Sequence, residues 1–190
     1  SSEIMRLFIA REAVDTHMKV AGDLIDPKVP TGRKVAAFLK AAVFYALWYP
    51  RLWLGLRGWF GYGSFGRLAT HLRFVERSSR RLARTLFHCM VRFGPKLEKR
   101  QAVLGRLVEI GAELLAISAA CSKAQAMLKK DPKNTGPREL ADVFSRQARR
   151  RVEQRFEAIW HNDDLVTYDV ARHVLDDHFL WLEKGIVGVE

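Results

Sequence analysis

This chain of 190 residues has few cysteines, few long apolar runs and little alternation of apolar and polar residues. Each of these features argues against a class of protein. The two cysteines, Cys89 and Cys121, are too few for a disulfide framework and lack the spacing of metal ligands. Both lie in apolar helical patterns, so we expect reduced thiols in a core, as in a cytosolic-type compartment. Alternation of apolar and polar residues never persists, which argues against a β-sheet.

The motifs of common catalytic centres are also absent from the sequence. It shows no Ser-His-Asp arrangement, no glycine-rich phosphate loop and no Cys-His pair. His173 and Asp177 are four residues apart, and His161 lies near Asp163, yet no third ligand stands at a known metal spacing. We therefore predict no metal site and interpret these side chains as caps or surface groups. We also expect no catalytic residue within these 190 residues.

Positive charge is what the sequence has in excess, with a net charge of +11. Residues 33–57 contain five basic side chains and no acidic one, and residues 67–106 contain eleven basic side chains against two acidic ones. The sign reverses from Asp163 onward, where seven acidic residues face only Arg172 and Lys184. Such a field favours a polyanionic partner, which could be a membrane surface, a nucleic acid or a CoA-type phosphate ligand.

Apolar residues recur at helical spacing through most of the chain, which predicts an all-α fold. A first helix spans residues 3–21. A very apolar helical stretch over residues 35–49 stops at Pro50, and a run rich in tryptophan and glycine follows up to Gly66. Four amphipathic helices with short connections then predict an antiparallel four-helix bundle, and they span residues 67–92, 96–129, 137–160 and 163–182.

The helix predicted over residues 96–129 carries a strong apolar pattern. Its spacing of i, i+3, i+4 and i+7 predicts one face that lies in the core of the bundle. The residues of this pattern are Leu104, Leu107, Val108, Gly111, Leu114 and Leu115.

The opening residues, SSEIMR, resemble a motif of the acyl-CoA dehydrogenase family. In that family a Glu-Gly-Thr (or Ser)-Ser/Asn-Glu/Gln-Ile-hydrophobic-Arg motif opens the last helix of the catalytic domain. The glutamate of the Glu-Gly pair is the usual catalytic base, which removes the α-proton of the acyl thioester while a hydride leaves the β-carbon for flavin N5. When the motif is aligned on Ile4 and Arg6, Ser1 falls on its threonine, so the base is expected just before Ser1.

The same resemblance implies where the cofactor FAD would lie. Residues at the start of the motif are near the flavin in this family, which implies cofactor-binding roles for Ser1, Ser2 and Glu3. Glu3 stands four residues beyond the base, near the adenylate portion of the flavin, and is therefore not the base itself.

A second block is similar to the very-long-chain branch of this family, which has an extra helical domain after the catalytic one. The block comprises Arg92-Phe93-Gly94, Gln101–Leu104 and Ser118–Ala124. The resemblance implies three parts. Residues 1–25 form the C-terminal helix of the catalytic domain, residues 26–66 a linker and residues 67–190 the helical bundle. The bundle in this branch replaces part of the packing of a tetramer, so a homodimer is expected.

The linker contains an aromatic and basic segment, residues 34–60. Its apolar core, residues 35–49, would extend about 22 Å as a helix at about 1.5 Å per residue, which is too short for a bilayer core of about 30 Å. Aromatic and basic side chains suit the headgroup region of an anionic membrane, and the corresponding linker of the very-long-chain branch is regarded as a membrane-surface element. The alternative is a helix buried against the bundle or against a dimer partner. We predict membrane contact through Phe38, Lys40, Trp48, Arg51, Trp53, Arg57 and Trp59.

Arginines are concentrated in two of the predicted helices. We favour a solvated or membrane-facing role for the first group, with an acidic partner protein as the second interpretation. Nucleic acid is disfavoured because no nucleic-acid-binding fold or aromatic stacking platform accompanies these arginines. The second group, Arg149 to Arg151, alternates with acidic residues of the same helix, which predicts a surface of ion pairs. The first group comprises Arg73, Arg77, Arg80, Arg81 and Arg84, and the acidic neighbours of the second are Glu139, Asp142, Glu153 and Glu157.

The resemblance implies a FAD-dependent parent enzyme that oxidises long-chain acyl-CoA to trans-2-enoyl-CoA in fatty acid β-oxidation. An electron-transfer flavoprotein would accept its electrons. The chain would serve membrane association and the packing of bundle and dimer. We expect a cytoplasmic protein at the inner face of a membrane, which would be the mitochondrial inner membrane in a eukaryote. The alternative is a free-standing basic helical module that binds membranes or nucleic acid.

Overall fold

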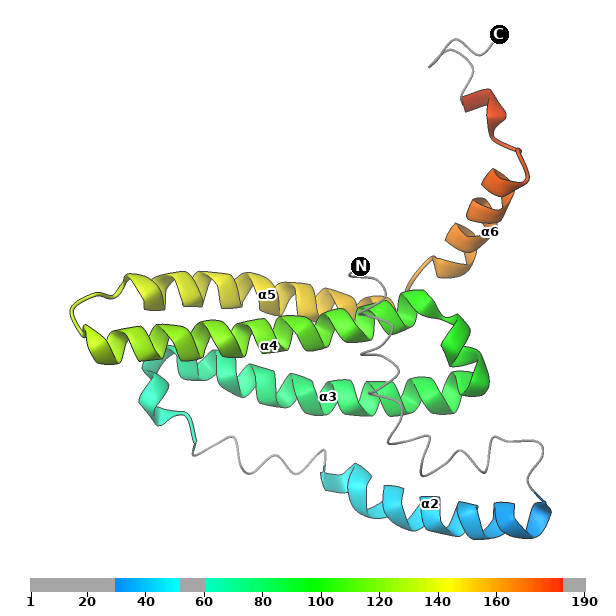
Figure 1. Cartoon of the computed structure of the whole chain (residues 1–190), viewed down its shortest axis with the longest axis horizontal. Helices are drawn as coiled ribbons and strands as arrows, with labels where there is room; N and C mark the ends of the chain where they lie inside the picture. The colour runs from blue at the N-terminus through cyan, green and yellow to red at the C-terminus, as the bar shows by residue number, and fades with distance from the viewer. Residues whose placement is uncertain (1–29, 52–60, 183–190) are drawn as a thin grey trace. The chain divides into compact units, whose positions relative to one another are not determined.

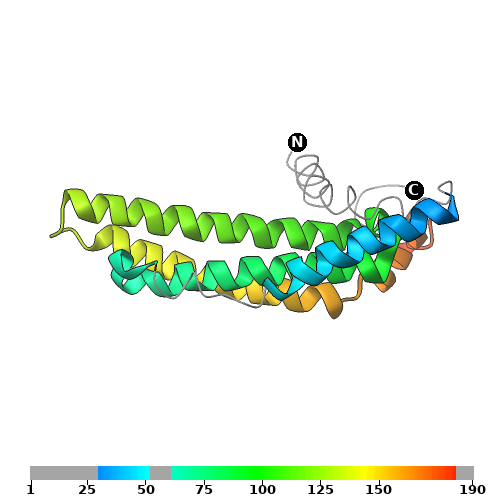
Figure 2. The same cartoon turned by 90° about the horizontal axis from the view of Figure 1, so that it is seen from below.

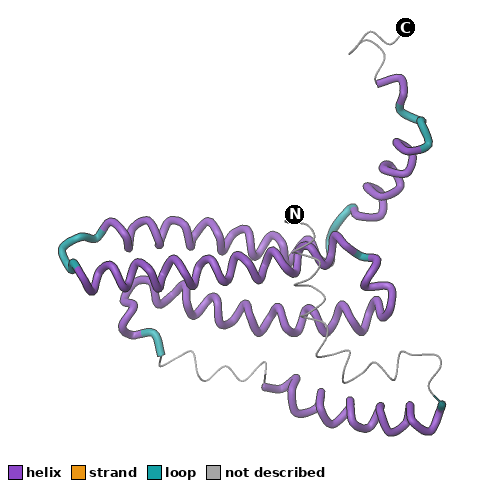
Figure 3. The backbone as a smooth tube through the Cα atoms, in the orientation of Figure 1, coloured by secondary structure: helices purple, strands orange, loops and turns teal. Residues whose placement is uncertain are grey.

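The computed structural model describes residues 30–51 and 61–182, and these residues contain helices and turns but no strand (Figures 1 and 3). This confirms the predicted all-α class. The α-helices are α2 (Thr31–Arg51), α3 (Ala69–Phe93), α4 (Gln101–Lys130), α5 (Gly136–Trp160) and α6 (Asp164–Leu175). Three short 3-10 helices accompany them, η2 (Gly63–Leu68), η3 (Gly94–Lys99) and η4 (Leu180–Leu182).

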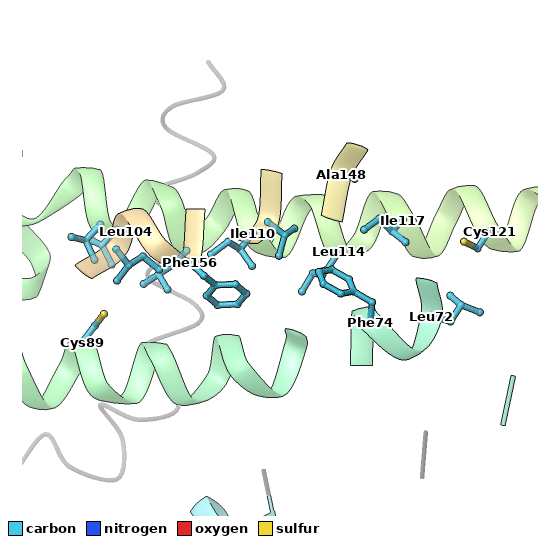
Figure 4. Close-up of a cluster of buried hydrophobic side chains, with 14 of the residues drawn as sticks. Leu72, Phe74, Cys89, Leu104, Ile110, Leu114, Ile117, Cys121, Ala148 and Phe156 are labelled. Carbon is cyan, nitrogen blue, oxygen red and sulfur yellow. The ribbon is translucent and has the colours of Figure 1, made fainter. Parts of the chain in front are cut away.

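Helices α3, α4 and α5 pack side by side, and each runs antiparallel to the one before it (Figures 1 and 2). Their shared core is a continuous row of apolar side chains, of which Ile110, Ile117 and Phe156 are almost completely buried (Figure 4). The core face predicted for α4 is confirmed for Leu107 and Leu114. Leu115 lies instead on the outside of α4 and is 71% exposed, because it follows Leu114 by 100° around the helix.

The junction between α3 and α4 differs from the predicted one. Gly94 ends α3 with a positive φ of 51°, a conformation that glycine adopts without strain. The predicted helix does not begin at Lys96, because Lys96 lies within the 3-10 helix η3, which starts at Gly94 and has Pro95 in its first turn. Helix α4 begins only at Gln101.

Helix α5 starts at Gly136, one residue before the predicted start. The side-chain oxygen of Asn134 accepts a hydrogen bond from the N–H of Gly136 at 3.1 Å. The hydroxyl of Thr135 donates to the carboxylate of Glu139 at 2.7 Å. These contacts satisfy polar groups of the first turn, which otherwise lack partners within the helix.

Helix α2 continues further than its proline predicts. Pro50 lies inside its last turn, and the helix ends at the next residue, Arg51. Proline removes one backbone N–H and crowds the preceding turn, so its cost is limited when almost no helix follows.

The residues from Trp160 onward form a second compact unit, separate from the unit that ends at Ile159. Helix α6 belongs to this second unit, and none of its residues is buried. The predicted four-helix topology is therefore not confirmed, because the described core is shared by three long helices.

The ends of α6 also differ in part from the prediction. The sequence allows Asn162 or Asp163 as a cap, and the side chain of Asn162 accepts the N–H of Asp164 at 3.2 Å. The helix ends at Leu175 rather than near residue 182, because a turn with Asp177 at a φ of 61° interrupts it.

The predicted domain boundaries remain predictions. The helix over residues 3–21 and the boundary at residues 25–26 lie outside the described residues. The boundary at residues 66–67 falls within η2, where Gly66 has a φ of 53°.

Candidate functional site

Helix α2 carries the described part of the predicted membrane segment. Phe38 is 61% exposed, and Lys40 is also exposed. Val43 and Leu47 are exposed to a similar extent, 62% and 61%. The four-residue spacing of Val43 and Leu47 places them on one face, so α2 has an exposed apolar side.

A different face of α2 contacts α3. The rings of Tyr45 and Tyr49 lie 4.7 and 5.7 Å from the ring of Phe87, measured between centroids. The hydroxyl of Tyr49 lies 3.0 Å from Nε2 of His88. The face of α2 with Tyr45 and Tyr49 therefore packs against the bundle, as the alternative prediction has it. The face with Val43 is not covered by other described residues.

Most other predicted site residues cannot be placed. The predicted cofactor residues Ser1, Ser2 and Glu3 lie outside the described residues, and so do Trp53, Arg57 and Trp59. Trp48 and Arg51 belong to α2, but their side chains are outside the description. In the described part of the chain no helix is long and apolar enough to cross a membrane.

Carboxylates on α4 bind arginines on α5. Glu113 accepts two hydrogen bonds from Arg151, at 2.6 and 2.9 Å, and Glu109 accepts one from Arg155 at 2.6 Å. The hydrogen bond from Arg151 lowers the pKa of Glu113, although burial opposes this shift. A carboxylate held ionised by two arginines stabilises the packing of two helices, and it is not suited to accept a proton from a substrate.

The predicted ion pairs of Arg149 to Arg151 with acidic residues of their own helix are not found among the described residues. Arg151 pairs with Glu113 of the neighbouring helix rather than with an acidic residue of its own helix. The guanidinium of Arg149 lies 4.7 Å from the centre of the Phe74 ring on α3. Helix spacing alone could not show this, because it reports only neighbours on the same helix.

A polar cluster around the buried His71 joins α3 and α5, and the sequence analysis did not predict it. Nε2 of His71, which is 2% exposed, lies 2.8 Å from Oδ1 of Asp142. Arg146 donates to the other carboxylate oxygen at 2.9 Å, and Arg149 lies 3.4 Å from Nδ1 of His71. The hydrogen bond to His71 and then that from Arg146 lower the pKa of Asp142. The only signal in the sequence is a histidine within the apolar pattern of α3, since its partner is 71 residues away.

Four arginines of α3 fall into two groups. Arg80 pairs with Glu76, and Arg81 pairs with Glu153 and lies over the ring of Phe156 at 4.1 Å. Arg73 and Arg77 form no ion pair with any other described residue. Part of the predicted arginine face is thus neutralised within the chain, and these two cations remain available to a partner.

Both cysteines are buried, as predicted. Burial raises the pKa of Cys89 to about 11, against a smaller opposing effect of Arg92. Burial also raises the pKa of Cys121, whose sulfur lies 3.7 Å from Oγ of Ser145. Thiols in this state have little thiolate and behave as small apolar side chains.

Two histidines of the second unit lie close together. The rings of His173 and His178 stack with centroids 4.8 Å apart. Among the described residues no group of three or more His, Cys, Asp or Glu side chains is placed to hold a metal ion.

Comparison with known proteins gives a more specific result than the geometry. No protein-family profile matches the chain, and no solved structure matches it. Three curated proteins named "Probable acyl-CoA dehydrogenase FadE10" are 53% identical to it over 190 residues, or 98% of this chain. They come from Mycobacterium bovis and from two strains of Mycobacterium tuberculosis, CDC 1551 and H37Rv. The chain spans 29% of the length of these relatives. This similarity confirms the family that the opening residues resemble: the chain belongs to the acyl-CoA dehydrogenase family.

Proposed function

We propose that the chain is the C-terminal part of a FAD-dependent acyl-CoA dehydrogenase of the very-long-chain type. The enzyme would oxidise long-chain acyl-CoA to trans-2-enoyl-CoA in fatty acid β-oxidation and pass electrons to an electron-transfer flavoprotein. The observation that carries this proposal is the 53% identity to probable acyl-CoA dehydrogenases over 98% of the chain. The motif at Ser1 to Arg6 supports it independently.

The catalytic chemistry would depend largely on residues outside this chain. Bound FAD would accept the hydride, with Ser1, Ser2 and Glu3 near it, and the base would be the glutamate of a Glu-Gly pair that precedes Ser1. The described carboxylates whose pKa values are shifted, Glu113 and Asp142, are both held ionised by cationic or histidine partners. They therefore serve the packing of helices.

The role proposed for α2 and the residues after it is contact with an anionic membrane. Val43 and Leu47 present an exposed apolar face with Lys40 near it, and Phe38 is exposed on the opposite side of the helix. Tyr45 and Tyr49 contact α3 on a different side of the helix. A helix with these two faces could hold the bundle at the surface of a membrane, where long acyl chains partition. The location would be the inner face of a membrane, with the protein on its cytoplasmic side.

The bundle would support a homodimer, as the resemblance to the very-long-chain branch implies. Exposed apolar residues outside α2, such as Leu115 and Leu140, are 71% and 75% exposed.

The DNA upstream of the codon for Ser1 tests the proposal directly. The proposal requires codons for Glu-Gly and an open reading frame for a large flavoenzyme immediately before that codon. A start codon placed directly before Ser1 would contradict it. That result would favour the alternative, a free-standing basic module, for which the net charge of +11 is the main argument.

A further inference from the structure

Helix α2 lies on one side of α3, and its contacts identify that side. The rings of Tyr45 and Tyr49 lie 4.7 and 5.7 Å from the ring of Phe87. The hydroxyl of Tyr49 lies 3.0 Å from Nε2 of His88. Phe87 and His88 therefore mark the direction from α3 toward α2.

Two arginines of α3, Arg73 and Arg77, point in the same direction. An α-helix turns by about 100° per residue, so both arginines lie between Phe87 and His88 around the helix axis. They lie toward the start of α3, about 15–21 Å from Phe87 along the axis at about 1.5 Å per residue. Arg77 is exposed and Arg73 is partly exposed, and neither forms an ion pair with another described residue. We call these two residues the arginine face.

The exposed apolar side chains of α2 also point away from α3. Val43 and Leu47 are 62% and 61% exposed. Each is two residues from Tyr45 in the sequence and therefore lies about 160° from it around the helix axis. Because Tyr45 faces α3, the apolar face of α2 and the arginine face both point outward on one side of the bundle.

The two faces lie at different distances from the axis of α3. Packed helices lie about 8–10 Å apart, axis to axis. The long side chains of Arg73 and Arg77 reach outward to about the distance of the α2 axis, whereas the apolar face of α2 lies about 5–6 Å beyond that axis. Helices at a membrane surface bury their apolar face about 5–10 Å into the boundary between headgroups and acyl chains. When α2 inserts in this way, the two guanidinium groups stay at the depth of the headgroups.

We propose that Arg73 and Arg77 bind the phosphate groups of anionic lipid headgroups while the apolar face of α2 inserts beside them. The planar guanidinium group of arginine donates paired hydrogen bonds to phosphate oxygens, which makes these two side chains suitable for the role. The contact rests on the membrane role proposed for α2, and it extends that role to the bundle itself. A membrane surface offers apolar and anionic groups together, at the two depths at which α2 and the arginine face lie.

Neutralisation of the arginine face tests this contact in the full 190-residue chain. One variant carries Arg73→Gln and Arg77→Gln. A matched control, Lys123→Gln with Arg150→Gln, removes the same charge from exposed positions of α4 and α5. Flotation with vesicles of equal parts phosphatidylcholine and phosphatidylglycerol measures the partition coefficient of each protein, and circular dichroism checks folding.

We expect the partition coefficient of the arginine variant to fall about thirtyfold, which corresponds to about 1 kcal/mol for each arginine. The control variant should lose much less at about 0.1 M salt, because the Debye length is then about 10 Å and only cations near the lipid are attracted. On vesicles of phosphatidylcholine alone, the wild type and the arginine variant should bind alike, since those headgroups carry no net charge.

A fluorescent label measures the proximity of lipid directly. The label is attached to the new thiol of Arg77→Cys or, as the control, of Lys123→Cys, since Cys89 and Cys121 are buried. A nitroxide on the lipid headgroup should quench the label at position 77 and leave the label at position 123 bright. Equal quenching at the two positions would exclude the proposed orientation of the bundle.

The outcomes separate this contact from the membrane role of α2. A wild type that does not bind anionic vesicles would remove both. If Val43→Ser with Leu47→Ser weakens binding and the Arg73 and Arg77 variant does not, α2 contacts the membrane without the arginine face. The arginine face would then be available to an acidic protein. Equal losses for the arginine variant and its control would show that only the net charge matters, and the specific contact would be excluded.

Discussion

At the scale of single residues, Glu113 and Asp142 titrate below their ordinary range because hydrogen-bond donors hold them ionised. Arg151 is the main cause of the lowered pKa for Glu113, and His71 for Asp142. A carboxyl group with a lowered pKa in the folded chain stabilises it fully above the ordinary pKa, here 4.5 and 3.8. This stabilisation is lost as the pH falls from those values through the lower folded pKa values.

We therefore predict that the variant Glu113→Gln with Asp142→Asn is less stable than the wild type near pH 7 and less sensitive to acid. Its free energy of unfolding should be lower by about 1–2 kcal/mol near pH 7, since the pairs are only partly shielded from water. Urea unfolding between pH 7 and pH 3 measures both quantities. If the free energy of unfolding fell equally with pH in the two proteins, these carboxylates would not be the cause of the acid sensitivity.

The two cysteines give a second prediction at this scale. Cys89, with a pKa of about 11, and the buried Cys121 should both react with a maleimide much more slowly in the folded chain than in urea. Counting of modified thiols by mass spectrometry checks this. Complete modification within minutes under native conditions would show that the core around them opens readily.

At the scale of helices, α4 is the central element of the bundle, and its two sides can be compared directly. Leu107 and Leu114 are 6% and 4% exposed, whereas Leu115 is 71% exposed. Leu107→Ala and Leu114→Ala should each lower the free energy of unfolding by about 2–5 kcal/mol, because each removes buried methyl groups and leaves a cavity. Leu115→Ala is the matched control and should change stability little in the same denaturation assay. Equal effects at all three positions would mean that the core face is misassigned.

Helix α2 gives the prediction about membranes. We expect the wild type to float with anionic vesicles at low salt and less at high salt, since each Lys or Arg near the surface adds about 1 kcal/mol. Val43→Ser with Leu47→Ser, and separately Trp48, Trp53 and Trp59 changed to Ser, should each reduce flotation, whereas Leu115→Ser should not. A wild type that stays with the soluble fraction would show that the exposed face of α2 is covered by protein. The tryptophan variant should then unfold at a lower temperature, because its loss leaves cavities.

Most helices of the bundle could be predicted because local chemistry sets their ends. Gly94 and Pro95 end α3, and the loop before Gly136 separates α4 from α5. The early end of α6 could not be predicted, because Asp177 adopts a positive φ that aspartate tolerates but does not require. The late start of α4 could not be predicted for a similar reason, since a proline can lie in the first turn of an α-helix or of a 3-10 helix.

At the scale of the whole molecule, contacts between distant residues were beyond sequence patterns. His71 pairs with Asp142 and Glu113 with Arg151 across helices, and these partners share no local spacing. The number of helices that share the core could not be predicted either. The amphipathic pattern of α6 indicates that its apolar side needs a partner, but it does not identify that partner. The family, by contrast, could be predicted from six residues, since the motif at Ser1 to Arg6 resembles one that opens a helix in this family.

The strong separation of charge along the chain also belongs to this scale. The basic residues 61–159 and the acidic residues 160–182 favour surfaces of opposite sign. An anionic membrane is the surface proposed for the basic part of the chain, through α2. Salt should weaken this association.

The most direct test of the account is flavin reduction by the longer reading frame that contains this chain. The purified product should carry FAD, and a long-chain acyl-CoA should bleach its absorbance under anaerobic conditions. Replacement of the glutamate in the Glu-Gly pair before Ser1 by glutamine should slow bleaching by orders of magnitude and leave FAD bound. The isolated 190-residue chain should retain no stoichiometric FAD. A longer product that binds no flavin, or an isolated chain that oxidises acyl-CoA, would contradict the account.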